Sequence, residues 1–188
     1  MSVTTDADLI VRCPWGSDPA MIAYHDNEWG RELCGDRELF ERLSLEAFQS
    51  GLSWAIILRK RDNFRAAFAG FDPEAVAAFG DADVARLLGD TGIVRNRLKI
   101  EATISNARTL LELDESFSDL LWSFAPPPAP APASFADVPA TTPESIAMAK
   151  ALKKRGFRFF GPTTAYALMQ ATGMVNDHLA GCVARSPA

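Results

Sequence analysis

The sequence has little of what a secreted, membrane-spanning or broadly basic protein requires. Its 188 residues include only three cysteines, and these lie far apart, which argues against a disulfide scaffold. There is no run of about 18 apolar residues and no basic-then-apolar N-terminus, so we expect no membrane span, no export and a cytoplasmic location. The net charge of −5 argues against a nucleic-acid binder that is basic all over, but it leaves a local basic face open.

What is present fits one globular domain over residues 1–188. Hydrophobic residues make up 48% and charged residues 23% of the chain, which are ordinary proportions for a protein with a substantial core. We expect residues 1–12 to form a loose arm and the proline-rich stretch 125–133, APPPAPAPA, to form a surface loop. Because the sequence shows no alternating strand pattern and no internal repeat, it predicts an all-α fold.

Apolar periodicity and capping residues predict where the helices lie. Residues 20–29 form a short mixed segment, and Asp36, Ser53, Asp72 and Thr142 are the expected N-caps, the last two followed by proline. Cys34 is interpreted as a packing residue. The expected helices are 37–49, 54–68, 73–79, 81–88, 94–113, 117–124, 143–155, 163–172 and 176–184.

The stretch Leu39 to Leu58 places a carboxylate on an otherwise apolar helix face. Its apolar residues recur at steps of three and four, and Glu46 interrupts them shortly before a turn at Ser50-Gly51. Trp54 begins the next helix, so an acid and a large aromatic residue flank the turn. An ionised carboxylate without a partner is costly to bury, which favours a functional site. Spacing alone also permits an exposed i, i+4 ion pair between Arg42 and Glu46.

The two histidines each lie near a cysteine, which suggests a metal site. His178 and Cys182 are four residues apart on the expected last helix, so both side chains would point to the same side. Cys13 and His25 are the natural remaining pair. Four such ligands close a tetrahedral zinc site that is structural and joins segments 13–30 and 174–184. Because the spacing is not that of a zinc finger, buried thiols and imidazoles remain an alternative.

A basic, glycine-bracketed connection lies between two expected helices near the C-terminus. Its flank from 150 to 158 has five basic residues and no acidic one, and Gly156 and Gly161 bracket the turn. Glycines allow backbone N–H groups to approach a phosphate, and the cations add non-specific attraction to duplex DNA. A solvated basic face is the alternative interpretation. The candidate DNA-contacting residues are Lys154, Arg155, Gly156, Arg158 and Gly161.

Several long strings resemble one family of DNA repair enzymes. They are CPWG, IAYHDNEWG, LFERLSLEAFQSGLSW, GIVRNRLKI, LKKRGFRFFGPTTAYALMQATGMVNDH and HLAGC, and they look like the 3-methyladenine DNA glycosylase I family, the TAG type. The resemblance spans about Arg12 to Cys182. It implies the all-α fold of the helix-hairpin-helix glycosylase superfamily, a lesion pocket between helices and one structural zinc ion.

The resemblance assigns roles to particular residues. The family's zinc ligands match Cys13, His25, His178 and Cys182, the four that spacing also suggests. Its pocket acid matches Glu46 and its pocket aromatics match Tyr24 and Trp54, while Met21 stands where other members have an aromatic residue. Asn176 occupies the place of the catalytic aspartate found elsewhere in the superfamily, and no lysine nucleophile for a lyase step is evident.

The activity that the resemblance implies is hydrolytic removal of N3-methyladenine from alkylated duplex DNA, without a lyase step. Glu46 is the expected catalytic-site acid, and it favours the cationic damaged base over neutral adenine more than it accelerates cleavage. The expected partners are double-stranded alkylated DNA and the product 3-methyladenine, and the expected state is a monomer. A non-catalytic zinc-containing DNA-binding module is one alternative. A zinc hydrolase is another, although four protein ligands leave no open position on the metal.

Overall fold

The computed structural model describes residues 11–16 and 18–185, which form nine α-helices, two short 3₁₀ helices and no strand. The all-α prediction is therefore confirmed for the described part of the chain. None of the helices described there is long and apolar enough to cross a membrane. The elements are α1 (Pro19–Asn27), α2 (Asp36–Gln49), α3 (Trp54–Ala67), η2 (Ala69–Phe71), α4 (Pro73–Ala77), α5 (Asp81–Gly89), α6 (Arg97–Leu111), α7 (Phe117–Trp122), η3 (Phe135–Asp137), α8 (Pro143–Lys154) and α9 (Pro162–Ala171).

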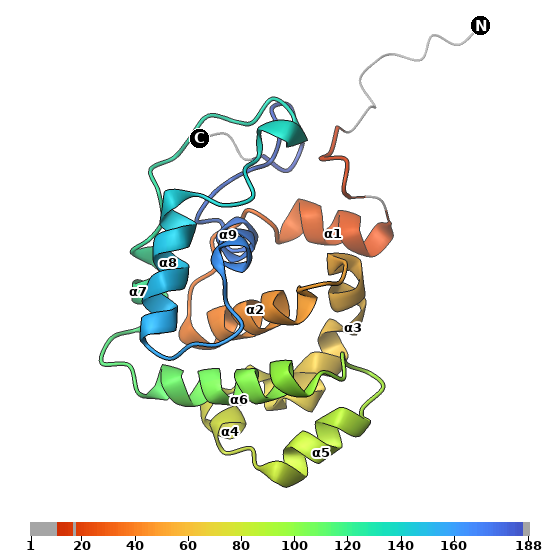
Figure 1. The fold of residues 1–188 in the computed structure, drawn as a ribbon. Helices are drawn as coiled ribbons and strands as arrows, with labels where there is room; N and C mark the ends of the chain where they lie inside the picture. The colour runs from red at the N-terminus through yellow and green to blue at the C-terminus, as the bar shows by residue number, and fades with distance from the viewer. Residues whose placement is uncertain (1–10, 17, 186–188) are drawn as a thin grey trace, which may run out of the picture.

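Helix α2 lies at the centre of the fold. It contacts α3, α6, α7 and α9, and Figure 1 shows α9 and α6 on opposite sides of it. A helix surrounded in this way needs apolar residues on most of its circumference. Leu39, Phe40, Leu43 and Phe48 are accordingly fully buried. The same central position places Glu46 inside the protein.

Most helix starts follow from local capping. Asp72 accepts a hydrogen bond from the Ala75 N–H at 3.0 Å, and Thr142 accepts one from the Ser145 N–H at 3.2 Å. Ser53 occupies the N-cap position of α3 as predicted. The predicted N-cap role of Asp36 is wrong, because Gly35 is the N-cap of α2. The Asp36 carboxylate is used elsewhere and accepts a bond from the Ser118 N–H at 2.8 Å.

The predicted helix 176–184 does not form. This segment is irregular, and two of its carbonyl groups bond to a side chain rather than to the backbone of a helix. Arg185 donates to the carbonyls of Asn176 and His178 at 2.9 and 2.7 Å. Gly181 has a φ of +82°, which a right-handed helix does not allow. Long-range bonding therefore replaces the local helix that the sequence pattern indicates.

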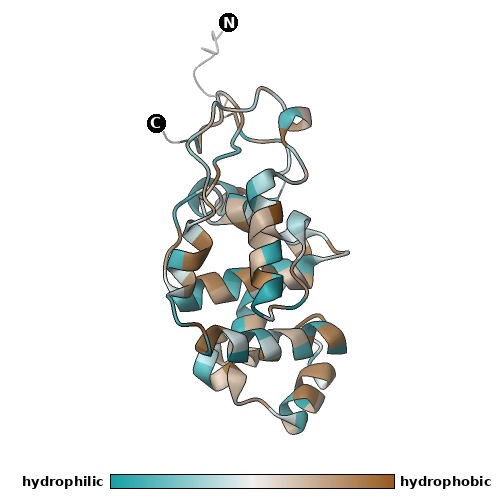
Figure 2. Cartoon of the chain, turned by 60° about the vertical axis from the view of Figure 1, so that its left-hand side comes forward, coloured by the Kyte–Doolittle hydropathy of each residue, from teal (hydrophilic) through white to brown (hydrophobic). Residues whose placement is uncertain are grey.

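The two ends of the described chain lie together with the loop between α7 and α8 (Figure 1, Figure 2). The Val183 N–H donates to the Val11 carbonyl at 2.9 Å, and the Ala180 N–H donates to the Pro132 carbonyl at 2.9 Å. Residues 127–130 of the proline-rich stretch are exposed. The predicted loose arm lies outside the described residues for 1–10, whereas Arg12 is bonded to Asp26.

Candidate active site and metal centre

A cavity of about 640 Å³ opens between α1, α2, α3, α9 and the segment that follows η3. This volume is within the range of small-molecule sites. The four sequence-predicted pocket residues, Met21, Tyr24, Glu46 and Trp54, all line it. The other lining residues are Trp15, Trp29, Gln49, Ser53, Ala55, Phe135, Val138, Pro139, Ala140, Thr163, Tyr166, Ala167 and Gln170.

Glu46 is the buried acid of this pocket. Its side chain reaches the cavity from α2, only 5% of the residue is exposed, and its carboxylate makes no hydrogen bond within the described residues. Burial raises the pKa of Glu46 to about 7, and the nearby positive charge of Arg42 opposes that rise. The site therefore holds an acid whose charge is poorly compensated by the protein, which is the condition for attracting a cation.

The exposed Arg42–Glu46 ion pair, which spacing permits, does not form. Arg42 is 8% exposed and donates through Nη1 to the Tyr24 hydroxyl oxygen at 2.9 Å. Its Nη2 lies 3.4 Å from the Glu28 carboxylate, which Arg61 also binds at 2.9 Å. Because the Tyr24 oxygen accepts from Arg42, the hydroxyl proton of Tyr24 is free to be donated elsewhere.

Aromatic side chains form a large part of the pocket wall. The rings of Tyr24 and Trp54 have centroids 5.3 Å apart at an interplanar angle of 41°. Trp15 and Trp29 continue this wall, with centroids 5.0 Å apart in an edge-on arrangement. The sequence analysis did not assign these two tryptophans to the pocket. Trp15 is part of the string CPWG, and Trp29 is part of the string IAYHDNEWG.

Tyr166 and Gln170 are further pocket residues that the sequence reasoning missed. Both come from α9, and both side chains donate hydrogen bonds to Asp177. Tyr166 and Gln170 precede Asp177 by 11 and 7 residues, and α9 ends before Asp177 is reached. Only their spacing at i, i+4 on a helix was visible in the sequence, and that pattern fits a core face equally well.

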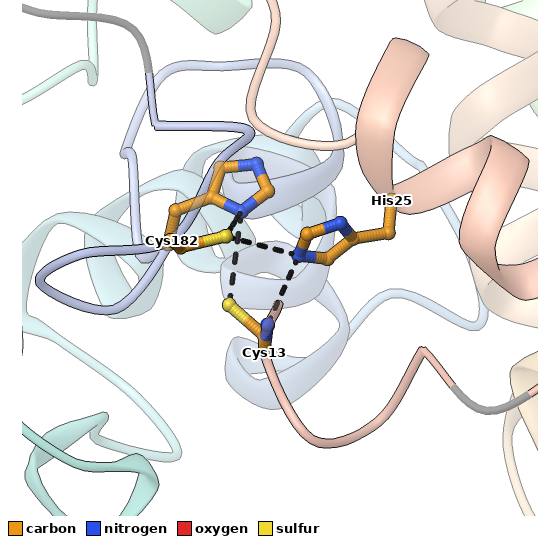
Figure 3. A group of neighbouring side chains, drawn as sticks. Cys13, His25 and Cys182 are labelled. Carbon is orange, nitrogen blue, oxygen red and sulfur yellow. Dashed lines mark hydrogen bonds between the residues drawn. The ribbon is translucent and has the colours of Figure 1, made fainter. Parts of the chain in front are cut away.

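The four predicted metal ligands come together in one buried cluster. Their ligand atoms all lie within 4.8 Å of one another, and no further group of His, Cys, Asp and Glu with this geometry occurs among the described residues. Figure 3 shows Cys13, His25 and Cys182 pointing toward a common centre from the N-terminal segment, α1 and the C-terminal segment. His178 completes the set, and each of the four residues is at most 5% exposed.

The cluster geometry fits a tetrahedral zinc ion. Zinc–sulfur and zinc–nitrogen distances of about 2.3 and 2.0 Å imply ligand-to-ligand distances of about 3.3 to 3.8 Å. The Cys182 Sγ lies 3.4 Å from His25 Nε2 and 3.5 Å from His178 Nδ1. The Cys13 Sγ lies 3.7 Å from His178 Nδ1. Burial raises the pKa of the Cys13 thiol to about 11, so a metal ion is the group that would stabilise its thiolate here.

The outward-facing ring nitrogens have partners that suit metal ligation. His25 Nδ1 lies 2.7 Å from Asp26, and the Arg12 guanidinium bound to that carboxylate lowers the pKa of Asp26 to about 2. His178 Nε2 lies 2.9 Å from the Trp29 carbonyl oxygen. These contacts fix each ring with its N–H outward and its lone pair toward the cluster. Asp26 is a supporting residue that sequence reasoning missed.

The Cys/His cluster contacts two tryptophans of the pocket wall. The Trp15 ring contacts the His25 ring edge-on, with centroids 4.9 Å apart. The Trp29 ring contacts the His178 ring with centroids 4.7 Å apart. Both tryptophans line the pocket. The same two rings therefore contact the metal ligands and the cavity.

The basic connection between α8 and α9 is an exposed surface with a fixed backbone. Arg158 and its neighbours project outward, while Phe157 and Phe160 are buried beneath them. Asn106 of α6, which is 2% exposed, accepts from the Arg158 N–H at 2.7 Å and donates to the Arg158 carbonyl at 3.0 Å. Sequence reasoning missed Asn106, because its partner lies 52 residues away. The predicted residues Lys154, Arg155, Gly156, Arg158 and Gly161 are all exposed.

The turn between α2 and α3 separates the pocket from this connection. A second hollow of about 840 Å³ is lined by the connection and by Ser50, whereas Gln49 and Ser53 line the pocket. Lys99 holds the turn, since its ammonium donates to the carbonyls of Phe48 and Ser50 at 2.8 and 2.6 Å. The two hollows thus share one rigid boundary.

The interpretation of Cys34 as a packing residue is wrong. Cys34 is exposed and donates to Glu32 at 3.6 Å, so it is not a core packing residue. Its thiol takes no part in the cluster of Cys13, His25, His178 and Cys182.

The fold and the site define a helical protein with an acid-containing, aromatic-lined pocket beside a basic surface. A sequence profile of the methyladenine glycosylase family matches residues 15–185, and the chain belongs to this family of enzymes, which act on N-glycosidic bonds. The family predicted from the sequence strings is therefore confirmed.

Similar proteins agree with this assignment in sequence and in structure. The chain is 50% identical over 177 residues to DNA-3-methyladenine glycosylase 1 of Escherichia coli (strain K12), covering 91% of this chain and 95% of the relative. It matches a crystal structure of 3-methyladenine DNA glycosylase I (TAG) with a TM-score of 0.91 and 52% identity, covering 94% and 100% of the two chains. A variant of 3-methyladenine DNA glycosylase I in complex with 3-methyladenine matches with a TM-score of 0.88 and 33% identity, covering 94% and 98%.

Proposed function

We propose that this protein removes 3-methyladenine from alkylated double-stranded DNA by hydrolysing the N-glycosidic bond, without a lyase step. The observation that carries the proposal is Glu46, a buried acid in an aromatic pocket whose charge has no hydrogen-bonding partner among the described residues. The names and the bound base of the similar proteins point to the same substrate.

Charge explains how such a pocket selects the damaged base. Methylation at N3 makes adenine in DNA cationic, whereas normal adenine is neutral. A cation in contact with Glu46 stabilises the ionised carboxylate and lowers its pKa from about 7, so binding gains free energy that neutral adenine does not provide. Glu46 therefore contributes mainly to selectivity between bases.

The aromatic residues add contact area and orientation. Tyr24 and Trp54 offer ring faces for stacking on a cationic ring, and Met21 packs as a flexible apolar residue at the same wall. Because Arg42 donates to the Tyr24 oxygen, the hydroxyl proton of Tyr24 remains available for donation to the ligand. The base must leave the duplex to reach these groups, and a damaged base leaves its stack at lower cost.

The exposed connection between α8 and α9 is the proposed DNA-binding hairpin of the helix-hairpin-helix type. Gly156 and Gly161 bracket it, and Lys154 and Arg158 supply positive charge. Backbone N–H groups and cations at such a turn suit phosphate binding. Since the α2–α3 turn lies between this connection and the pocket, a duplex held at the hairpin presents its bases to the pocket mouth.

The Cys₂His₂ cluster is proposed to hold one structural zinc ion. Cys13, His25, His178 and Cys182 would supply its four ligands, which leaves no open position for water. When bound, the ion supplies cross-linking energy and orients Trp15 and Trp29 through its histidine ligands. The chain presents its proposed site within a single copy, which is consistent with a monomer.

A hydrolytic reaction without a lyase step fits the pocket composition. The residues that line the pocket in the described chain include no lysine, and the buried Lys99 is bound to two carbonyl groups of the α2–α3 turn. An amine nucleophile is therefore not in place. N3-methylation already weakens the glycosidic bond, so orientation of the base and support of the developing sugar cation suffice for modest acceleration.

The decisive experiment is incubation of the zinc-containing protein with methylated duplex DNA and identification of the released base by chromatography. We expect free 3-methyladenine and no strand cleavage. Replacing Glu46→Gln should reduce selective lesion binding by about tenfold or more, because the loss of an ionic hydrogen bond costs roughly 1.5 to 3 kcal/mol. The single-turnover cleavage rate of bound lesion should fall much less.

A matched control is Glu38→Gln, since Glu38 is an exposed residue on the same helix. It should behave as the unsubstituted protein. Release of no base by a protein that binds zinc and DNA would instead identify a non-catalytic DNA-binding module. Complete loss of cleavage in Glu46→Gln with unchanged lesion binding would show that the division of roles is wrong.

A further inference from the structure

Asp177 bonds to two pocket residues that the proposed recognition does not use. The Tyr166 hydroxyl donates to Asp177 Oδ2 at 2.6 Å, and Gln170 Nε2 donates to the same oxygen at 2.8 Å. Tyr166 and Gln170 both lie on α9 and line the pocket opposite α2. The carboxylate thus holds two polar side chains of the pocket wall by their donor groups.

This contact determines which end of the Gln170 amide faces the cavity. An ionised carboxylate only accepts hydrogen bonds, so the amide must turn its NH₂ group toward Asp177. Its carbonyl oxygen, Oε1, is then turned away from Asp177 and receives no hydrogen bond from the described residues. The Tyr166 proton also points to Asp177, and burial raises the pKa of Tyr166, so the phenol stays protonated.

The orientation of the Gln170 amide is fixed because Asp177, to which it bonds, is itself held in place. Asp177 immediately precedes His178, whose ring bonds to the Trp29 carbonyl and whose own carbonyl accepts from Arg185. Turning the Gln170 amide over would place its carbonyl oxygen against the Asp177 carboxylate, so that two acceptors face each other. The partly buried carboxylate would also lose one of its hydrogen-bond donors. Such an unpaired group costs on the order of 1 to 3 kcal/mol.

We propose that Gln170 is a specificity-determining residue whose carbonyl accepts a hydrogen bond from an exocyclic amino group of the bound base, and that Asp177 is the positioning residue that fixes it. This inference rests on the proposed function of the pocket. A purine with an amino group at its six-position matches the fixed acceptor. A purine with an oxo group there places two acceptors against each other and is rejected.

The test compares two free bases that differ at this position, 3-methyladenine and 3-methylhypoxanthine. Their affinities for the zinc-containing full chain are measured by calorimetry at one pH. We expect the unsubstituted protein to prefer 3-methyladenine, and Gln170→Met to reduce that preference by about tenfold, the equivalent of one mismatched hydrogen bond. An unchanged preference in Gln170→Met would overturn the inference.

Gln49→Met is the matched control, since Gln49 also lines the pocket. Its amide makes no hydrogen bond within the part of the chain that the structure describes, so it can present either atom and should not affect the ratio of the two affinities. An equal fall of the ratio in Gln49→Met would count against a special role of Gln170.

Asp177→Asn tests the positioning role. An asparagine can donate as well as accept, so the Gln170 amide is free to turn, and we expect the preference to fall as in Gln170→Met. The zinc content and the unfolding midpoint of Asp177→Asn show whether this variant keeps its structure. If it does not, the result for Gln170→Met alone decides whether the inference holds. Absence of 3-methyladenine release by the unsubstituted protein would contradict the proposed function, which is a separate result.

Discussion

At the scale of single residues, Glu46 exists in two forms near neutral pH. Its pKa of about 7 means that folding favours the protonated acid, whereas a bound cation favours the carboxylate. Ligand binding and proton release at this one residue are therefore linked. A pocket built in this way has an affinity that depends on pH even when the ligand itself does not titrate.

This linkage predicts how affinity changes with pH for a ligand of permanent charge. The 3,9-dimethyladeninium ion is a suitable probe, because it stays positively charged over the range. We expect its affinity to be constant above pH 7 and to fall about tenfold per unit below it, since protons compete for Glu46. Titration calorimetry between pH 5 and pH 9 measures the effect.

The Glu46→Gln variant provides the reference for this measurement. It should bind the probe weakly and with a flat pH profile, because its side chain does not titrate. An identical pH profile in both proteins would assign the titration to another group.

The sequence predicted that Glu46 lines a pocket with Met21, Tyr24 and Trp54, but it did not predict the hydrogen bonds around them. Glu46 stood out because a carboxylate interrupted an apolar periodicity and because the surrounding string resembled a known family. The partners of Arg42 were not predictable, since Glu28 and Tyr24 lie 14 and 18 residues away, Tyr24 on α1 and Glu28 directly after it. Gln170 carried no signal, because its contact with Asp177 depends on the irregular segment after α9.

At the scale of elements, prediction succeeded where bonding is local. The caps at Asp72 and Thr142 each bond to an N–H three residues ahead, so their effect is encoded in a few adjacent residues. Helix α6 begins at Arg97, three residues later than expected, because Asn96 caps it by accepting from the Lys99 N–H. The predicted helix 176–184 does not form because Arg185 binds two of its carbonyl groups and because His178 and Cys182 join the cluster with residues of the N-terminal part.

Two glycines with positive φ allow a test of how element ends are built. Gly173 ends α9 with a φ of +77°, and an added Cβ would lie 2.5 Å from the carbonyl carbon of Arg31. Gly51 has a φ of +83° and no heavy atom within 4 Å of such a Cβ. We expect Gly51→Ala to cost about 1 to 2 kcal/mol of unfolding free energy, from backbone strain alone.

Gly173→Ala should cost roughly 3 kcal/mol or more, because a clash between two backbone segments adds to the same strain. Denaturant unfolding of both variants measures the difference. Similar losses would mean that the segment at Arg31 shifts freely to accommodate a methyl group.

At the scale of the whole molecule, the proposed zinc ion would close almost the entire chain into a ring. Cys13 and His178 are 165 residues apart, and the loop-closure entropy for such a length corresponds to about 5 kcal/mol. The four ligands come from three separate segments, as Figure 3 shows for Cys13, His25 and Cys182. The cluster was predictable from the small number of histidines and cysteines, even though the expected helix under two of them was wrong.

Metal removal should therefore lower stability and alter the pocket together. We expect a strong chelator to reduce the unfolding free energy by about 5 kcal/mol and to change tryptophan fluorescence, since Trp15 and Trp29 contact the ligand rings. Cys182→Ser should give the same result without chelator.

Cys34→Ser is the matched control, because Cys34 is exposed and outside the cluster. It should retain one zinc ion per chain by elemental analysis. An unfolding curve that chelation leaves unchanged would show that the cluster contributes no closure energy.

The order in which the four proposed ligands are synthesised determines when the ring can close. His25 and Cys182 are separated by 157 residues, so at about 5 to 20 residues per second the second pair of ligands leaves the ribosome roughly 10 to 30 s after the first. Until then, the nascent polypeptide has neither a closed cluster nor the His178 ring against which Trp29 is placed. The pocket wall that Trp29 forms against His178 is thus completed only after the segment 178–182 has been synthesised.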